Sequence, residues 1–171
     1  MSVMTKGSFS LNLGIVKLGV ELAEHDRQCA WELYTEIATR LALTGKKDDS
    51  KCSNYEGEVY AESLGSVYAF FQEARRIMRK FPVGKLKGDV RNHLGVLINN
   101  IMIDVLRPFL EKHQARYRYW WERKSNPKLP PFERQKEYPR LKEFLQDWSN
   151  VRKLMKAVLR KLQQVYKLVQ V

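Results

Sequence analysis

The stretch YPRLKEFLQDWSNVRKLMKAVLRKLQQVYKLV, residues 138–169, has the most regular pattern in this chain of 171 residues. Its apolar residues recur at alternating steps of four and three positions, a spacing typical of one face of an α-helix. The stripe consists of Phe144, Trp148, Val151, Met155, Val158, Leu162, Val165 and Val169, widened by Leu141, Leu145, Leu159 and Tyr166. The stretch is therefore predicted to form one long amphipathic helix with a broad buried face.

Three other segments also have helical periodicity. Residues 56–81 repeat the steps of four and three until Pro82 interrupts them, and a further segment covers about residues 89–126. A first region covers about residues 11–43, although the glycines within residues 11–20 also allow a short strand or a bent first turn. Together with the last stretch, these segments predict four long helices.

Pro108 interrupts the third of these helices, because proline lacks a backbone N–H and crowds the preceding turn. The helix therefore either kinks there or ends, with a new helix beginning at Pro108. The connections, residues 44–54, 82–88 and 126–139, are short, so consecutive helices are expected to be antiparallel neighbours. These observations predict an all-α, up-down bundle of four long helices, with a possible fifth from the break at Pro108, in one domain spanning residues 1–171.

The composition is that of a globular protein, because apolar residues make up 44% of the chain and charged residues 29%. The two cysteines, Cys29 and Cys52, have no metal-ligand spacing and suggest no disulfide framework, so a cytoplasmic location is expected. The first residues lack the pattern of a signal peptide. No apolar run approaches the roughly 18 residues of a membrane span, so none is predicted.

Positive charge is concentrated in the second half of the chain. The formal net charge is +12, yet residues 1–86 hold 12 Lys and Arg against 11 Asp and Glu. Residues 87–171 hold 19 Lys and Arg against 8 Asp and Glu. This division into a near-neutral half and a basic half suggests a polyanionic partner, such as nucleic acid, an anionic membrane surface or an acidic protein.

Two basic segments form the candidate nucleic-acid interface. Residues 107–127 interleave cations, which can contact phosphates, with aromatic rings, which can stack on unpaired bases. The last helix has a basic row opposite its apolar stripe, nearly free of acidic residues after Asp147. The competing interpretations are that the rings pack on neighbouring helices and that the basic row is a solvated face. The predicted nucleic-acid-binding residues are Arg116, Arg118, Trp120, Arg123, Lys124, Arg152, Lys153, Lys156, Arg160, Lys161 and Lys167.

Arg107 and His113 have an R-x5-H spacing, which resembles the motif of HEPN-type ribonucleases, small all-α proteins that cleave RNA without a metal. The resemblance implies that Arg107 would stabilise phosphoryl charge and that His113 would act as acid or base. It covers two residues only, and Pro108 stands where HEPN motifs commonly have a small polar residue. Six positions on a regular helix rotate by about 600°, so the two side chains converge only if Arg107 lies in the break.

Metal and cofactor chemistry have little support in the sequence. Glu21, His25 and Cys29 form an i, i+4, i+8 ladder of metal-ligand residue types. No Glu-x-x-His on another helix completes a di-metal site, and Cys29 is more typical of a small core residue. The glycine motifs of nucleotide-binding sites and the nucleophile motif G-x-S-x-G are absent. No metal, cofactor or catalytic residue is therefore favoured.

The leading hypothesis is a non-catalytic cytoplasmic accessory module that holds RNA or DNA, mainly by its phosphate backbone, through residues 107–124 and 152–167. The near-neutral half would contact a partner protein or a second copy of the chain. The near-neutral half resembles small helical accessory proteins of bacterial defence loci in its general character, without a diagnostic motif. The alternatives are a protein–protein adaptor whose apolar stripes engage partner helices, a HEPN-like metal-independent ribonuclease and a peripheral membrane protein.

Overall fold

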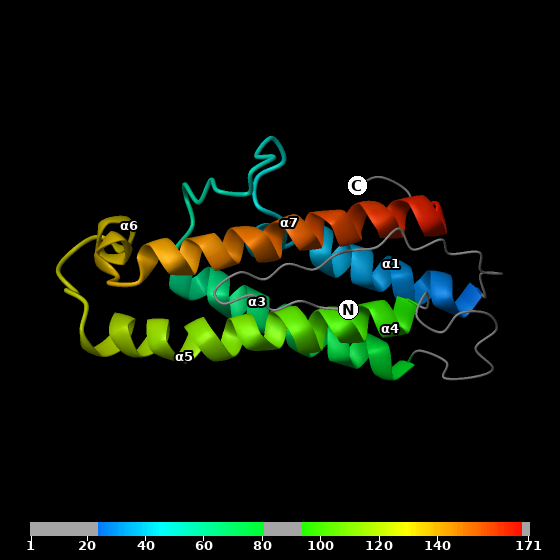
Figure 1. The fold of residues 1–171 in the computed structure, drawn as a ribbon, viewed down its shortest axis with the longest axis horizontal. Helices are drawn as coiled ribbons and strands as arrows, with labels where there is room; N and C mark the ends of the chain where they lie inside the picture. Colours follow the sequence, from blue (N-terminus) through cyan, green and yellow to red (C-terminus); the bar gives the residue numbers. More distant parts are fainter. Residues whose placement is uncertain (1–23, 81–93, 169–171) are drawn as a thin grey trace.

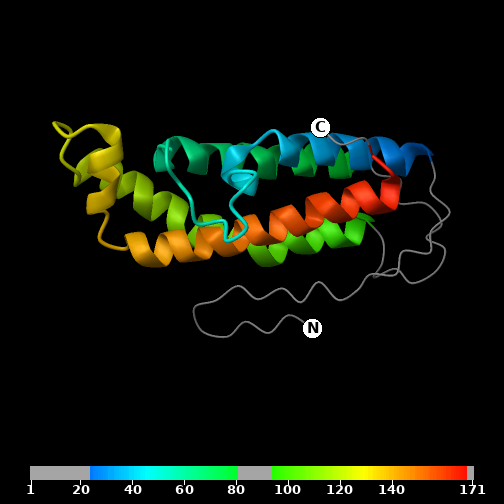
Figure 2. The ribbon, with the colours of Figure 1, turned by 90° about the horizontal axis from the view of Figure 1, so that it is seen from above.

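The computed structural model describes residues 24–80 and 94–168, and this part of the chain is all-α, with 78% of its residues helical and no strands. Four long helical rods lie side by side and run alternately in opposite directions (Figures 1 and 2). The rods are α1 (Glu24–Ala38), α3 (Tyr60–Lys80), the consecutive α4 (Leu94–Ile101) and α5 (Arg107–Arg123), and α7 (Leu141–Tyr166). The predicted up-down bundle is confirmed. None of the described helices is long and apolar enough to cross a membrane.

The apolar stripe of α7 faces the interior of the bundle. Phe144 and Trp148 are fully buried, whereas Val169 lies outside the described residues. The Trp148 ring centroid lies 5.1 Å from that of Phe144, 6.0 Å from that of Phe109 on α5 and 6.1 Å from that of Tyr60 on α3. Burial of each such side chain contributes about 1.5–3 kcal/mol. This aromatic cluster therefore holds α3, α5 and α7 together.

Pro108 changes the geometry of the third rod without ending it. α4 passes into a π-helical turn, η2 (Met102–Leu106), and α5 begins at the next residue. The N–H of Arg107 donates to the carbonyl of Met102, five residues back. Because this turn is wider than an α-helical turn, it accommodates the proline ring at the start of α5. The possible fifth helix is thus present as α5, which continues the rod begun by α4 (Figure 1).

The first rod ends earlier than the periodicity predicts. Residues 11–23 of the predicted helix lie outside the described residues, and α1 ends at Ala38. α2 (Leu41–Thr44) follows after Arg40, whose backbone is extended at φ −105° and ψ 102°. The Arg40 side chain turns back to pair with Glu36 at 2.6 Å. The prediction of one helix through residue 43 is therefore wrong at this turn, because extended dihedral angles cannot continue an α-helix.

The connection between α5 and α7, predicted as a linker over residues 126–139, contains two short helical segments. They are α6 (Pro131–Arg134) and the 3₁₀ turn η3 (Gln135–Glu137). The buried Gln135 side chain accepts a hydrogen bond from the N–H of Tyr60, the first residue of α3, at 2.9 Å. This bond satisfies one of the N–H groups that a helix leaves open at its start. The connection is therefore tied to the end of the bundle where α5 and α7 meet.

Candidate nucleic-acid interface

The outward side of α7 carries cations and no carboxylates. Lys142, Lys153 and Arg160 are exposed on this side, and exposed Lys167 follows at its end. Lys153 and Arg160 are two turns apart, about 10.5 Å along the axis, because an α-helix rises about 1.5 Å per residue. The uncharged residues between these cations are Gln146, Asn150, Ala157 and Gln164. We call these four cations and four uncharged residues the α7 face.

The two carboxylates of α7 lie away from the α7 face. Asp147 is buried, and Glu143 pairs with Lys112 of α5 at 2.7 Å and with Arg140 at 2.8 Å. The hydrogen bond from Lys112 holds the pKa of Glu143 below its usual value, so this carboxylate stays ionised and compensated. Within residues 24–80 and 94–168, none of the cations of the α7 face forms an ion pair. The α7 face therefore presents uncompensated positive charge to solvent.

Arg152 lies in the interior, so its predicted place on the basic face is wrong. Its side chain is fully buried, and Nη2 lies 2.5 Å from Oε2 of buried Glu58. Nε donates to the carbonyl of Ala42 at 3.2 Å, and the guanidinium lies over the Tyr55 ring at 4.2 Å. A buried charge is stable only with such partners, because desolvation of an unpaired ion is costly. Arg152 therefore anchors the segment between α2 and α3, residues 45–59, to α7.

Lys156 is also engaged within the protein. It is half-buried, and Nζ donates to the carbonyls of Lys46 and Asp49 at 2.8 Å each. These two bonds hold the first part of the 45–59 segment against α7. The prediction that Lys156 belongs to an open anion-binding row is therefore not supported, since its three donors are largely committed. Lys161 is half-buried beside the α7 face, and its role in nucleic-acid binding stays a prediction.

On α5 the predicted cations divide between two flanks. Arg116 and Arg123 share the flank that borders α7 with Lys112, which contacts both carboxylates of α7. Arg118 lies on the other flank, and Lys124 follows the last residue of the helix. All four predicted cations are exposed, and none forms an ion pair with another residue of the described chain. Only the flank toward α7 extends the basic surface of that helix.

The two adjacent tryptophans are packing residues. Trp120 is half-buried, and its ring centroid lies 5.6 Å from that of Tyr117 and 5.1 Å from that of Tyr138. Trp121 stacks on Tyr117 at 6.1 Å and is covered by the guanidinium of Arg134 at 3.9 Å. The structure thus favours the packing interpretation for Trp120 over the predicted base-stacking role.

The aromatic residue of this region that reaches solvent is Tyr119, which the predicted site did not include. Its side chain is 58% exposed. The signal available in the sequence was its position three residues after Arg116 and four before Arg123, which places all three on one flank of the helix.

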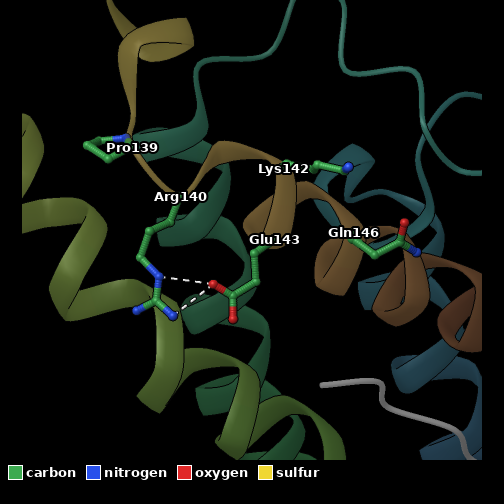
Figure 3. Close-up of a pocket in the computed structure, with 5 residues that line it drawn as sticks. All are labelled: Pro139, Arg140, Lys142, Glu143 and Gln146. Carbon is green, nitrogen blue, oxygen red and sulfur yellow. Dashed lines mark hydrogen bonds and ion pairs between the residues drawn. The ribbon is translucent and has the colours of Figure 1, made fainter. Parts of the chain in front are cut away.

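The α7 face and the basic flank of α5 come together near the start of α7. An open hollow of about 460 Å³ lies there, lined by Pro139, Arg140, Lys142, Glu143 and Gln146 (Figure 3). Arg140 and Glu143 point toward one another on its α5 side, whereas Lys142 and Gln146 extend along the other side. The hollow is formed by residues at the start of α7, is open to solvent and is not an enclosed ligand cavity.

Tyr138 packs against Trp120 of α5 and lies two residues before Arg140 in the sequence. Burial raises the pKa of its phenol above the usual value, while the positive charges of Arg140 and Arg116 oppose that rise.

The two residues of the R-x5-H spacing do not meet. Arg107 is exposed and pairs with Glu111 at 2.8 Å, whereas His113 is buried with Nε2 2.8 Å from Oδ2 of Asp147. Burial lowers the pKa of His113 below its ordinary 6.5, although its hydrogen bond to Asp147 opposes the shift. α5 is regular from Arg107 onward, so the two side chains lie on different sides of the helix. This geometry assigns His113 to the core.

The ladder of metal-ligand residue types begins at Glu21, which lies outside the described residues, and Cys29 is buried in the core. Among the residues that the structure describes, no group of three or more His, Cys, Asp or Glu is arranged to hold a metal ion. Comparisons of the chain with protein-family models, curated proteins and solved structures found no match.

Proposed function

We propose that this protein is a non-catalytic accessory module that holds nucleic acid through its phosphates on the α7 face and the basic flank of α5. The observation that carries the proposal is the α7 face, where four cations are separated only by uncharged residues. Phosphates that approach such cations release condensed counterions, which supplies binding free energy without any reading of sequence.

The shape of the basic surface favours an elongated polyanion. Lys142 and Lys167 are 25 residues apart, which corresponds to roughly 37 Å along a helix axis. A small phosphate ligand needs converging donors, whereas the α7 face distributes its cations along a line. Linear spacing of positive charge suits the repeating phosphates of a nucleic-acid backbone.

The first test is binding of fluorescent RNA and DNA oligonucleotides across a salt series. The Lys153→Glu/Arg160→Glu double variant removes two cations from the α7 face without touching a described hydrogen bond. We expect steeply salt-dependent binding by the native chain. In the variant, affinity falls and the slope of log K against log salt decreases by about 2, because two phosphate contacts are lost.

A matched control is Arg75→Glu/Arg79→Glu on α3, which changes net charge equally. Both arginines are exposed, and α3 packs against α1 and α5, diagonally across the bundle from α7 (Figure 2). An equal loss of binding in this control would assign the effect to net charge and not to the α7 face. Absence of binding at low salt would contradict the proposal. It would favour the protein–protein adaptor, whose partner would then be sought among the proteins that copurify with the chain.

A further inference from the structure

Tyr119 is exposed to solvent on a flank of α5 that also carries two exposed cations. On its flank of α5, Arg116 precedes it by three residues and Arg123 follows it by four, and both are exposed. Lys112 begins the same row and ties it to α7 through Glu143. The row contains no carboxylate, because the acidic residues of α5 occupy its other side.

The exposure of Tyr119 is not explained by the packing of the bundle. Tyr117 and Trp120 supply ring contacts between this part of α5 and Tyr138, and Trp121 is covered by the guanidinium of Arg134. Tyr119 takes part in no ring pair or hydrogen bond within the described residues. An exposed aromatic ring between two guanidinium groups has the chemistry of a platform for a nucleobase, because base faces stack on aromatic rings while cations hold the neighbouring phosphates.

The row is continuous with the α7 face. Lys112 of this row and Arg140 at the start of α7 pair with the same carboxylate, that of Glu143, at 2.7 and 2.8 Å. Lys142, two residues beyond Arg140, lines the hollow (Figure 3). A strand whose phosphates follow α7 can therefore pass this hollow and reach Tyr119.

We infer that Tyr119 is a base-stacking residue, with Arg116 and Arg123 holding the phosphates on either side, and that the ligand is single-stranded nucleic acid. This inference rests on the proposed function and adds its substrate class. In a duplex, the interior bases already stack on one another and are paired, so their faces are not available to a side chain. An unpaired base has both faces available.

The test compares Tyr119→Ala and Tyr119→Phe with the native chain, using a single-stranded RNA, a single-stranded DNA of the same sequence and a duplex of equal length. We expect Tyr119→Ala to weaken single-strand binding at least about fivefold, while Tyr119→Phe, which keeps the ring, binds nearly as the native chain does. The salt slope should not change, because no cation is lost. Weakening in both the RNA and the DNA arms supports base stacking, because both strands present base faces. Weakening confined to RNA would contradict stacking and point to a contact with the 2′-hydroxyl.

Tyr68→Ala serves as the matched control, because Tyr68 is an exposed tyrosine on α3, away from the α7 face. Urea unfolding curves measured for every variant will show whether each one remains folded. Single-strand binding unchanged by Tyr119→Ala, or duplex binding weakened equally, would overturn the inference while salt-dependent binding still supported the proposed function. Absence of salt-dependent binding to every probe would overturn both.

Discussion

Arg152 and Lys153 are adjacent in sequence and have opposite surroundings. Lys153 is exposed on the α7 face, whereas Arg152 is enclosed by Glu58, Ala42 and Tyr55. The helical pattern of the last stretch predicted which apolar residues are buried, but a cation's burial depends on a partner elsewhere. Here the partner is 94 residues away in sequence, within the 45–59 segment. No local pattern could have indicated it.

At this scale we predict that Arg152→Met destabilises the protein by about 3–5 kcal/mol, because it leaves the buried Glu58 carboxylate without its partner. Urea unfolding measures the change. Lys153→Met is the control and should alter the free energy of unfolding by no more than about 0.5 kcal/mol. Adding Glu58→Gln to Arg152→Met should recover part of the loss. Equal effects from the Arg152 and Lys153 variants would show that the buried pair adds no stability.

The helices were more predictable than the way in which they begin and end. Steps of four and three positions correctly indicated α3 and α7, because burial of one face imposes that period on the sequence. The turn at Arg40 interrupts a segment with good helical residues, and it depends on side-chain contacts with Glu36 and with Ser66 on α3. Pro108 indicated a kink or break in the third helix. The form of that break, a π-helical turn, depends on how both halves of the rod pack, which the local sequence does not show.

The contact of α7 with the 45–59 segment leads to a prediction at the scale of the element. Lys156→Met removes the two hydrogen bonds to the carbonyls of Lys46 and Asp49. We expect local opening of the segment to become more frequent, so that trypsin cleaves after Lys46, Lys47 or Lys51 about tenfold faster, since charged hydrogen bonds contribute about 1.5–3 kcal/mol.

Limited proteolysis followed by mass spectrometry measures this cleavage. Lys153→Met is again a suitable control, because it removes an exposed lysine of the same helix and leaves the segment untouched. The same rate in both variants would mean that Lys156 does not hold the 45–59 segment. Nucleic-acid binding should keep its salt slope in Lys156→Met, since Lys156 is not part of the α7 face.

For the whole molecule, the depressed pKa of His113 predicts how stability depends on pH. In the unfolded chain His113 titrates near 6.5, and in the folded chain burial lowers its pKa. Between the two pKa values the unfolded state binds more protons than the folded state. The stability that neutral His113 contributes is therefore fully present above about pH 6.5, and it decreases as the pH falls toward the folded pKa. The slope cannot exceed about 1.4 kcal/mol per pH unit for one group.

Urea unfolding at several pH values between 7 and 5 measures this dependence. A His113→Gln variant, which keeps a hydrogen-bonding side chain next to Asp147, should lose the part of the slope that His113 contributes. Identical slopes in the two proteins would show that His113 does not titrate differently on folding. Its hydrogen bond to Asp147 would then serve packing and not a pH-dependent stability.

The arrangement of the whole bundle was predictable because short connections leave consecutive helices little choice but to be antiparallel. The candidate site was predictable only in outline. Charge asymmetry placed it in the second half of the chain, but the exposure of Tyr119 and the burial of Trp120 both depend on where α7 lies against α5. Those contacts arise from the complete fold.

Lys112 contacts Glu143 and Asp147, and so braces α5 against α7 between the two basic surfaces. These two ion pairs affect the entropy change when a ligand binds. Cations carried by two braced helices need little rearrangement to meet a ligand, so the protein gives up little conformational freedom on binding. In the proposed complex, the ordering cost would fall mainly on the flexible nucleic acid and on the ends of the lysine and arginine side chains that contact it.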